Sequence, residues 1–186
     1  MPQNRTRKIA VAGILGAVSV LLGITHWGFI PWFGGISLTI MHVPVIIGAI
    51  LEGPVVGLVI GLIFGLFSLI QAAVAPTAPA DVWFTNPLLS VLPRLFIGPA
   101  AWLAWKALSR WKVAGIIAAG LAGSLTNTIL VLTMIGVLGF LPSFEVLAGI
   151  AVTNGIPEMF VSTLVVVLVM GAWWRMNLRK KAGSDL

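Results

Sequence analysis

Cationic side chains occupy only a few short stretches of this chain, and apolar segments separate these stretches. Of the eleven Lys and Arg residues, Arg94 alone lies inside an apolar segment. The other ten fall at the two ends and in one central stretch: Arg5, Arg7, Lys8, Lys106, Arg110, Lys112, Arg175, Arg179, Lys180 and Lys181. Because short cytoplasmic loops of membrane proteins hold the cations, all three clusters are expected on one face of a bilayer.

The composition indicates an integral membrane protein. Hydrophobic residues make up 59% of the chain and charged residues 9%, which is too little polar surface to cover a soluble globule. The net charge of +6 could suggest a nucleic-acid partner, but the cations stand at segment ends without forming a basic face, so that partner is excluded. Cysteine is absent, which excludes disulfides and thiolate metal sites, and neither a metal nor a cofactor is expected.

Six apolar segments can be drawn as membrane crossings, which need about 20 residues each, although the second is short and interrupted by Pro44. They lie at about 8–25, 37–52, 54–74, 87–108, 112–140 and 145–174. They predict an all-α membrane protein with one domain (1–186), six transmembrane helices and both termini in the cytoplasm. The turn Glu52-Gly53-Pro54 carries no cation, so it could instead be a kink in a re-entrant hairpin.

Small residues recur at helical spacing in two of the predicted helices. In the third helix the row is Gly53, Gly57, Gly61 and Gly65, which lets another helix approach closely, either within this chain or in another protein. In the first helix, Ala12 and Gly16 form one pair, and Gly13 and Ala17 form a second.

Arg94 marks a candidate site, because a cation within a spanning helix is costly unless it finds a partner or water. Counted back by helical turns, Ser90 and Asn86 share its face. Arg94 is therefore expected to face the interior, where it either serves a ligand or forms a structural pair with Glu158.

Two further helices carry polar faces within apolar sequence. Asn154 and Glu158 stand four residues apart around Pro157, and Asn127 and Thr128 follow Ser124 in G-S-L-T-N-T. Together with Arg94 they predict a small polar cavity. The outer loops add Trp27, Trp32, Trp83 and Phe84, which would either cover a pocket or form an interfacial aromatic belt.

No catalytic residues are predicted, since the sequence has no H-E-x-x-H or G-x-S-x-G motif, and no P-loop for ATP. Active transport would therefore need a partner or an ion gradient. A self-sufficient proton-coupled carrier using Glu158, a membrane scaffold without a ligand and, more remotely, a membrane enzyme remain open on these residues alone.

The chain resembles the substrate-binding (S) components of energy-coupling factor (ECF) vitamin transporters. The matching segments are R-K-I-A-V-A-G-I-L-G-A at 7–17, H-V-P-V-I-I-G-A-I-L-E-G-P-V-V-G at 42–57, L-P-R at 92–94, G-S-L-T-N-T at 123–128 and N-G-I-P-E at 154–158. The resemblance implies six helices in a prokaryotic plasma membrane and a vitamin site near the outer face. It also implies a transmembrane T component and two cytoplasmic ATPases as partners. These partners would drive the substrate-loaded protein to topple, that is, to tilt over within the membrane.

Pantothenate-type members are the most similar, and an acidic vitamin suits a buried arginine, because guanidinium binds carboxylate bidentately. Folate and riboflavin remain alternatives. The predicted substrate-binding residues are Arg94, Asn86, Ser90, Asn127, Thr128, Asn154, Glu158, Trp27, Trp32 and Trp83. By the same resemblance, the first helix would dock the partner through Ala12, Gly13, Gly16 and Ala17.

Overall fold

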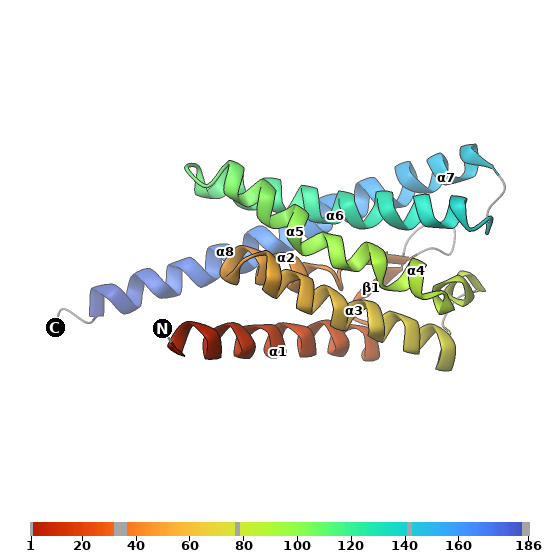
Figure 1. Cartoon of the computed structure of the whole chain (residues 1–186). Coiled ribbons are helices and arrows are strands. Elements are labelled where there is room, and N and C mark those ends of the chain that lie inside the picture. The colour runs from red at the N-terminus through yellow and green to blue at the C-terminus, as the bar shows by residue number, and fades with distance from the viewer. Residues whose placement is uncertain (1, 32–36, 77–78, 141–142, 184–186) are drawn as a thin grey trace.

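The computed structural model describes residues 2–31, 37–76, 79–140 and 143–183, which form a bundle of helices (Figure 1). The helices are α1 (Pro2–Ile24), α2 (Val43–Glu52), α3 (Pro54–Val74), α4 (Pro87–Ser90), α5 (Leu92–Ala107), α6 (Lys112–Val137), α7 (Phe144–Ile150) and α8 (Ile156–Gly183). The other elements are strands β1 (Phe29–Pro31) and β2 (Ser37–Thr39), the 3₁₀ helix η2 (Pro79–Thr85) and the π-helical turn η3 (Ala151–Gly155).

Within the described residues, five helical segments are long and apolar enough to cross a membrane. They are Arg5–Ile24, Pro54–Val74, Pro87–Ala107, Lys112–Val137 and Phe144–Arg175, the last of which runs through α7, η3 and α8. The predicted helical membrane architecture is thus confirmed, whereas a sixth full-length span is not found among these residues.

The prediction of a second helix over 37–52 was wrong in its first part. Residues Ser37–Thr39 form strand β2, which pairs antiparallel with β1, and the helix begins only at Val43. Ten residues of α2 cover about 15 Å, half of the hydrocarbon thickness. Strands are tolerated at such depth only where protein buries them, and here β2 packs against α8 and η3.

The two chain termini lie at one end of the bundle (Figure 1). The connection from α5 to α6 lies at this end as well, whereas η2, α4 and α7 lie at the other end. The chain returns from α1 to α3 through β2 and α2, and Gly53, with φ of 98°, turns it into α3. This arrangement agrees with the expectation that the cationic clusters share one side. Which side is cytoplasmic stays a prediction.

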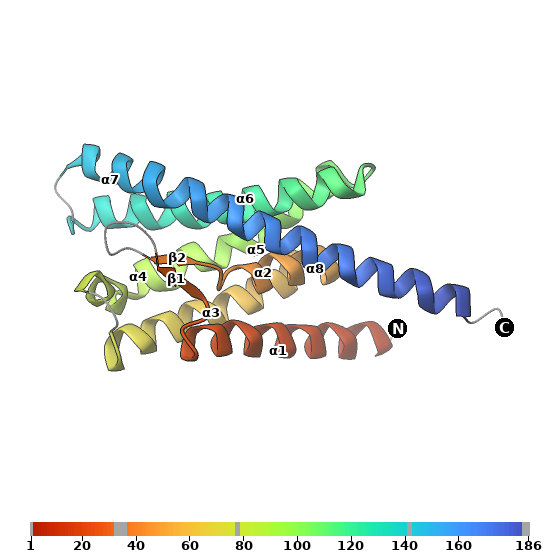
Figure 2. The same ribbon diagram turned by 180° about the vertical axis from the view of Figure 1, so that it is seen from behind.

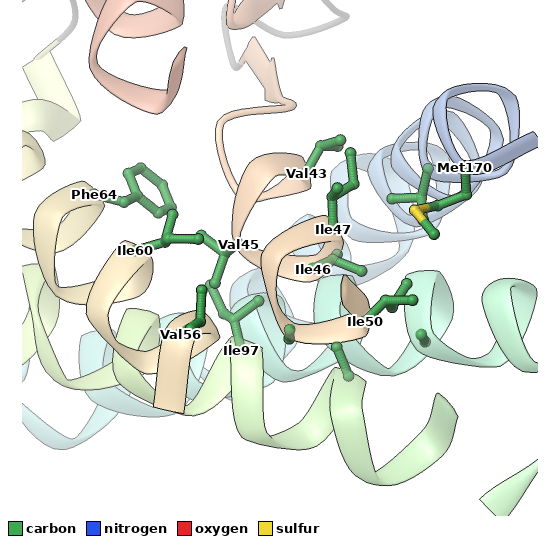
Figure 3. Close-up of a cluster of buried hydrophobic side chains, with 14 of the residues drawn as sticks. Val43, Val45, Ile46, Ile47, Ile50, Val56, Ile60, Phe64, Ile97 and Met170 are labelled. Atoms are coloured by element: carbon green, nitrogen blue, oxygen red, sulfur yellow. The ribbon is translucent and has the colours of Figure 1, made fainter. Parts of the chain in front are cut away.

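The hydrophobic core surrounds α2, of which every residue from Val43 to Ile50 is buried. Figure 3 shows Val45 beside Ile60 and Ile97, which come from α3 and α5. On the other side of α2, Met170 of α8 completes the same cluster. The short helix α2 is therefore enclosed by α3, α5 and α8.

The glycine row of α3 packs within the chain, which answers the question that the sequence left open. A methyl group built on Gly57 would lie 2.8 Å from Cα of Gly98, and one on Gly65 would lie 2.9 Å from the Ser90 carbonyl oxygen. A methyl on Gly61 would overlap the carbonyl oxygen of Arg94. The backbone of α3 thus touches that of α5 at Gly57 and Gly61 and that of Ser90 at Gly65, whereas a methyl on Gly53 would meet nothing within 4 Å. The contact at Gly61 places the Arg94 backbone against α3.

The two small-residue pairs of α1 face opposite ways. Ala12 belongs to the core, and a methyl on Gly16 would lie 2.7 Å from Cδ1 of Ile63 in α3. Gly13 and Ala17 are exposed, and a methyl on Gly13 would meet nothing within 4 Å. Only the second pair is available to a partner, so the docking expectation is corrected for Ala12 and Gly16.

The substitution Gly61→Ala is expected to lower the free energy of unfolding by about 1–3 kcal/mol, because the added methyl forces α3 away from α5. Gly13→Ala is the matched control. It should be neutral or stabilising by up to about 1 kcal/mol, the helix preference of Ala over Gly. Denaturant unfolding in detergent, followed by tryptophan fluorescence, measures both variants, and equal stability of the two would contradict the close α3–α5 contact.

Candidate functional site

A cavity of about 270 Å³ lies in the half of the bundle remote from the chain termini. Its walls come from β1 and β2, from α3, η2, α5 and α6, and from the chain through α7, η3 and α8. Figure 2 shows, from behind, how these helices and strands are arranged in the bundle. The lining residues are Phe29, Thr39, Met41, Phe64, Ser68, Gln71, Ala72, Ala80, Asp81, Trp83, Phe84, Arg94, Asn127, Thr128, Val131, Leu132, Ile135, Ile150, Asn154, Gly155 and Glu158.

Arg94 contributes a buried cation to this cavity from the first turn of α5. Its side chain is only 5% exposed, and Nη1 donates a hydrogen bond to the carbonyl oxygen of Leu89 at 2.6 Å. The guanidinium carbon lies 5.4 Å from the ring centroid of Phe64 and 5.0 Å from that of Phe84. Nε has no hydrogen-bond partner among the described residues. The two aromatic faces and one carbonyl satisfy the cation in part and leave donor capacity for a ligand.

Glu158 contributes a buried carboxylate from the first turn of α8. Its Oε2 accepts a hydrogen bond from the backbone N–H of Thr39 at 3.0 Å, which ties the hairpin to α8. Its Oε1 lies 4.0 Å from Nδ1 of His42, which is longer than a hydrogen bond. Asn127 of α6 lines the same cavity as Glu158.

The structural Arg94–Glu158 pair is not formed. Among the described residues, Arg7 pairs with Glu52 at 2.7 Å, whereas no Lys or Arg comes within ion-pair distance of Glu158, whose Oε1 instead lies 4.0 Å from Nδ1 of His42. Arg94 and Glu158 line the cavity from α5 and α8, and each of these helices packs against α6 and α2. The cation and the anion therefore share one cavity without touching each other.

The amide residues face the same space. Asn127 is buried on α6, next to Thr128, and Asn154 stands in the π-helical turn η3. The side-chain oxygens of Asn127 and Asn154 are buried and find no hydrogen-bond partner within the part of the chain that the structure describes. Ser124 is also buried with an unpaired hydroxyl, but it does not line the cavity.

Proline explains why the helix widens at Asn154. Pro157 has no N–H to donate to the preceding turn, and its ring clashes with a regular helical carbonyl, so the backbone opens into η3. At this turn Gly155 approaches α6 closely, since a methyl built there would lie 2.7 Å from Cγ2 of Thr128. The turn thus brings Asn154 against the polar face of α6.

Four of the ten predicted binding residues do not reach the cavity or lie outside the described residues. Asn86 caps α4 by accepting the Leu88 N–H at 2.9 Å, and the Ser90 hydroxyl donates to the Phe84 carbonyl. Trp27 is 81% exposed and does not line the cavity. Trp32 falls outside the described residues.

Trp83 lines the cavity as expected of an outer-loop aromatic. Its ring stacks on that of Phe140, with centroids 5.8 Å apart and an interplanar angle of 12°. This contact joins η2 to the segment that follows α6, so it connects two walls of the cavity.

Sequence reasoning missed the wall formed by the hairpin and by the end of α3. Thr39 and Phe29 line the cavity only because the first loop folds back as two strands. Ser68 and Gln71 lie on α3, where Gln71 is a polar residue in an otherwise apolar turn, and that polarity was an available signal.

Comparison with known proteins agrees with this architecture. Residues 7–170 match the family model described as the substrate-specific component of ECF transporters. A pantothenic acid transporter of Lactococcus lactis subsp. cremoris is 27% identical over 92% of this chain and 96% of its own length. A pantothenate transporter of Leuconostoc mesenteroides is 29% identical over 73% of this chain and 72% of its own length.

The family match spans most of the chain, from α1 to α8, and includes the helices that carry Arg94, Asn127 and Glu158. It confirms the resemblance to S components. The chain belongs to the family of substrate-specific components of ECF transporters.

Proposed function

We propose that this chain is the vitamin-binding subunit of an ECF-type importer and that its substrate is pantothenate. The observation that carries the proposal is Arg94, a buried guanidinium that lines the cavity with unused donor capacity. Two relatives whose names contain pantothenate or pantothenic acid support the choice of substrate.

The chemistry of pantothenate fits the walls of the cavity. Its carboxylate suits Arg94, because a charge-assisted hydrogen bond to guanidinium compensates both charges on burial. Its dimethyl group suits the apolar side chains of Val131, Leu132 and Ile135, which line the cavity from α6.

Cavity size and wall chemistry disfavour the other two vitamins. A volume of about 270 Å³ is small for a ligand pocket, whose usual range is about 300–1,000 Å³, and folate and riboflavin carry large fused rings. Riboflavin would stack on tryptophan, yet Trp83 is the one Trp among the lining residues that the structure describes.

Energy for uptake would come from a T component and two cytoplasmic ATPases, because the chain has no P-loop of its own. With the cationic end in the cytoplasm, as short-loop cations favour, the cavity lies in the outer half of the membrane. The exposed Gly13–Ala17 pair of α1 would then face the T component and allow close helix contact.

Arg94→Ala is expected to weaken pantothenate binding at least 30-fold, about 2 kcal/mol, because the ligand carboxylate loses its buried cation. Arg110→Ala, which removes an exposed cation far from the cavity, should leave affinity unchanged. Isothermal titration of purified protein measures both, with thermal unfolding as the test of folding. A change of less than about threefold, or about 0.7 kcal/mol, in a folded Arg94→Ala variant would rule out this role for Arg94.

Gly13→Trp is expected to abolish co-purification with the T component while leaving pantothenate affinity within about threefold, because the bulky ring separates the two helices. Leu164→Trp, at a lipid-exposed position of α8, is the matched control and should assemble normally. Normal assembly of Gly13→Trp would reject this docking surface.

A separate measurement tests the alternative function. Uptake into liposomes that contain this chain alone, abolished by Glu158→Gln, would favour a self-sufficient proton-coupled carrier.

A further inference from the structure

We propose that Asn127, Asn154 and Glu158, here called the acceptor cluster, recognise the hydroxyl groups of the ligand, while Arg94 recognises its carboxylate. The inference rests on the proposed function and adds to it an orientation of the ligand and a rule of specificity. The site would select a molecule that carries an anionic group at one end and hydroxyl donors at the other.

The acceptor cluster contains buried oxygen atoms that lack donors among the described residues. Oδ1 of Asn127 and Oδ1 of Asn154 are both buried, and neither has a hydrogen-bond partner there. An amide oxygen can only accept a hydrogen bond, so each of these atoms requires a donor. Buried acceptors without a donor are rare in native proteins, because each one loses its hydration without compensation.

The two buried charges of the cavity determine where a ligand carboxylate can bind. A ligand carboxylate beside Glu158 would place two anions together in a site of low dielectric, which is strongly unfavourable. Beside Arg94 the same group finds an unpaired Nε and a guanidinium held between Phe64 and Phe84. Arg94 of α5 and Glu158 of α8 line the same cavity, so one ligand inside it can contact both residues.

The acceptor cluster requires hydrogen-bond donors from the remaining groups of the ligand. Hydroxyl groups donate hydrogen bonds to amide and carboxylate oxygens, whereas a hydrocarbon at the same place leaves those oxygens unpaired. Sites built in this way reject analogues that lack the donor far more strongly than apolar pockets reject a missing methylene. The pantoyl part of pantothenate carries two hydroxyl groups, which meets this requirement.

The test compares three ligands by isothermal titration. They are pantothenate, its alcohol analogue with a hydroxymethyl group in place of the carboxylate, and N-(3,3-dimethylbutanoyl)-β-alanine, which keeps the carboxylate and lacks both hydroxyls. The wild-type protein should bind the analogue without hydroxyls at least about tenfold more weakly than pantothenate, since it leaves buried acceptors unpaired. Equal affinity for these two ligands would overturn the inference.

The variants Asn154→Leu and Glu158→Gln should show the complementary pattern. Each is expected to weaken pantothenate at least about tenfold and the analogue without hydroxyls by less than about threefold. Arg94→Met should do the reverse, weakening both acids strongly and the alcohol analogue little. Glu145→Gln, the same change at an exposed position of α7, should alter none of the affinities.

The outcomes separate this inference from the proposed function. Acceptor-cluster variants that weaken all three ligands equally would assign the cluster a structural role and overturn the inference, with the proposed function intact. A wild-type protein that binds neither acid would overturn both. If a variant fails to fold, as judged by thermal unfolding, the wild-type comparison of pantothenate with the analogue lacking hydroxyls still decides.

Discussion

Burying a guanidinium inside an apolar bundle is the constraint on which the arrangement around the cavity depends. Transfer of such a charge from water costs several kcal/mol or more unless acceptors and counter-charges compensate it. Arg94 has a carbonyl, two aromatic faces and a cavity beside it, but no ion pair among the residues that the structure describes. Its compensation is incomplete, which is the state expected of a residue that completes its interactions with a ligand.

The place of Arg94 follows from the smallest residues in the chain. Gly57 and Gly61 bring α3 into backbone contact with α5, and the Arg94 carbonyl lies against Gly61. Gly65 allows the same close approach to Ser90 and Val91, just before α5 begins. A larger residue at these positions would separate the helices. The shortness of α2 makes room for the cavity. Its ten residues span only about half of the hydrocarbon thickness, and the strands β1 and β2 occupy the other half beside the cavity.

Long apolar segments and isolated polar residues could be predicted from the sequence, because hydropathy and helical spacing act locally. Asn127, Thr128, Asn154 and Glu158 line the same cavity as Arg94, because they stand on two long helical segments, α6 and the segment that runs through α7, η3 and α8. Asn86 and Ser90 did not, because the helix breaks at Val91 and both side chains satisfy the local backbone.

The pairing of β1 with β2 could not be predicted, because it depends on contacts between residues far apart in the sequence. A short apolar run such as 37–42 is compatible with helix or strand, and only pairing with β1 and burial against α8 decide between them. As a result Phe29 and Thr39 line the cavity, while Trp27, two residues before Phe29, points away from it. Such long-range contacts leave no periodic signature in the sequence.

The most direct test of the central claim is an experimental structure of the protein with bound pantothenate. The account predicts the ligand inside the cavity, with its carboxylate about 2.7–3.0 Å from the Arg94 guanidinium nitrogens, the distance of a charge-assisted hydrogen bond. A ligand bound elsewhere, or one whose carboxylate lies away from Arg94, would contradict the account.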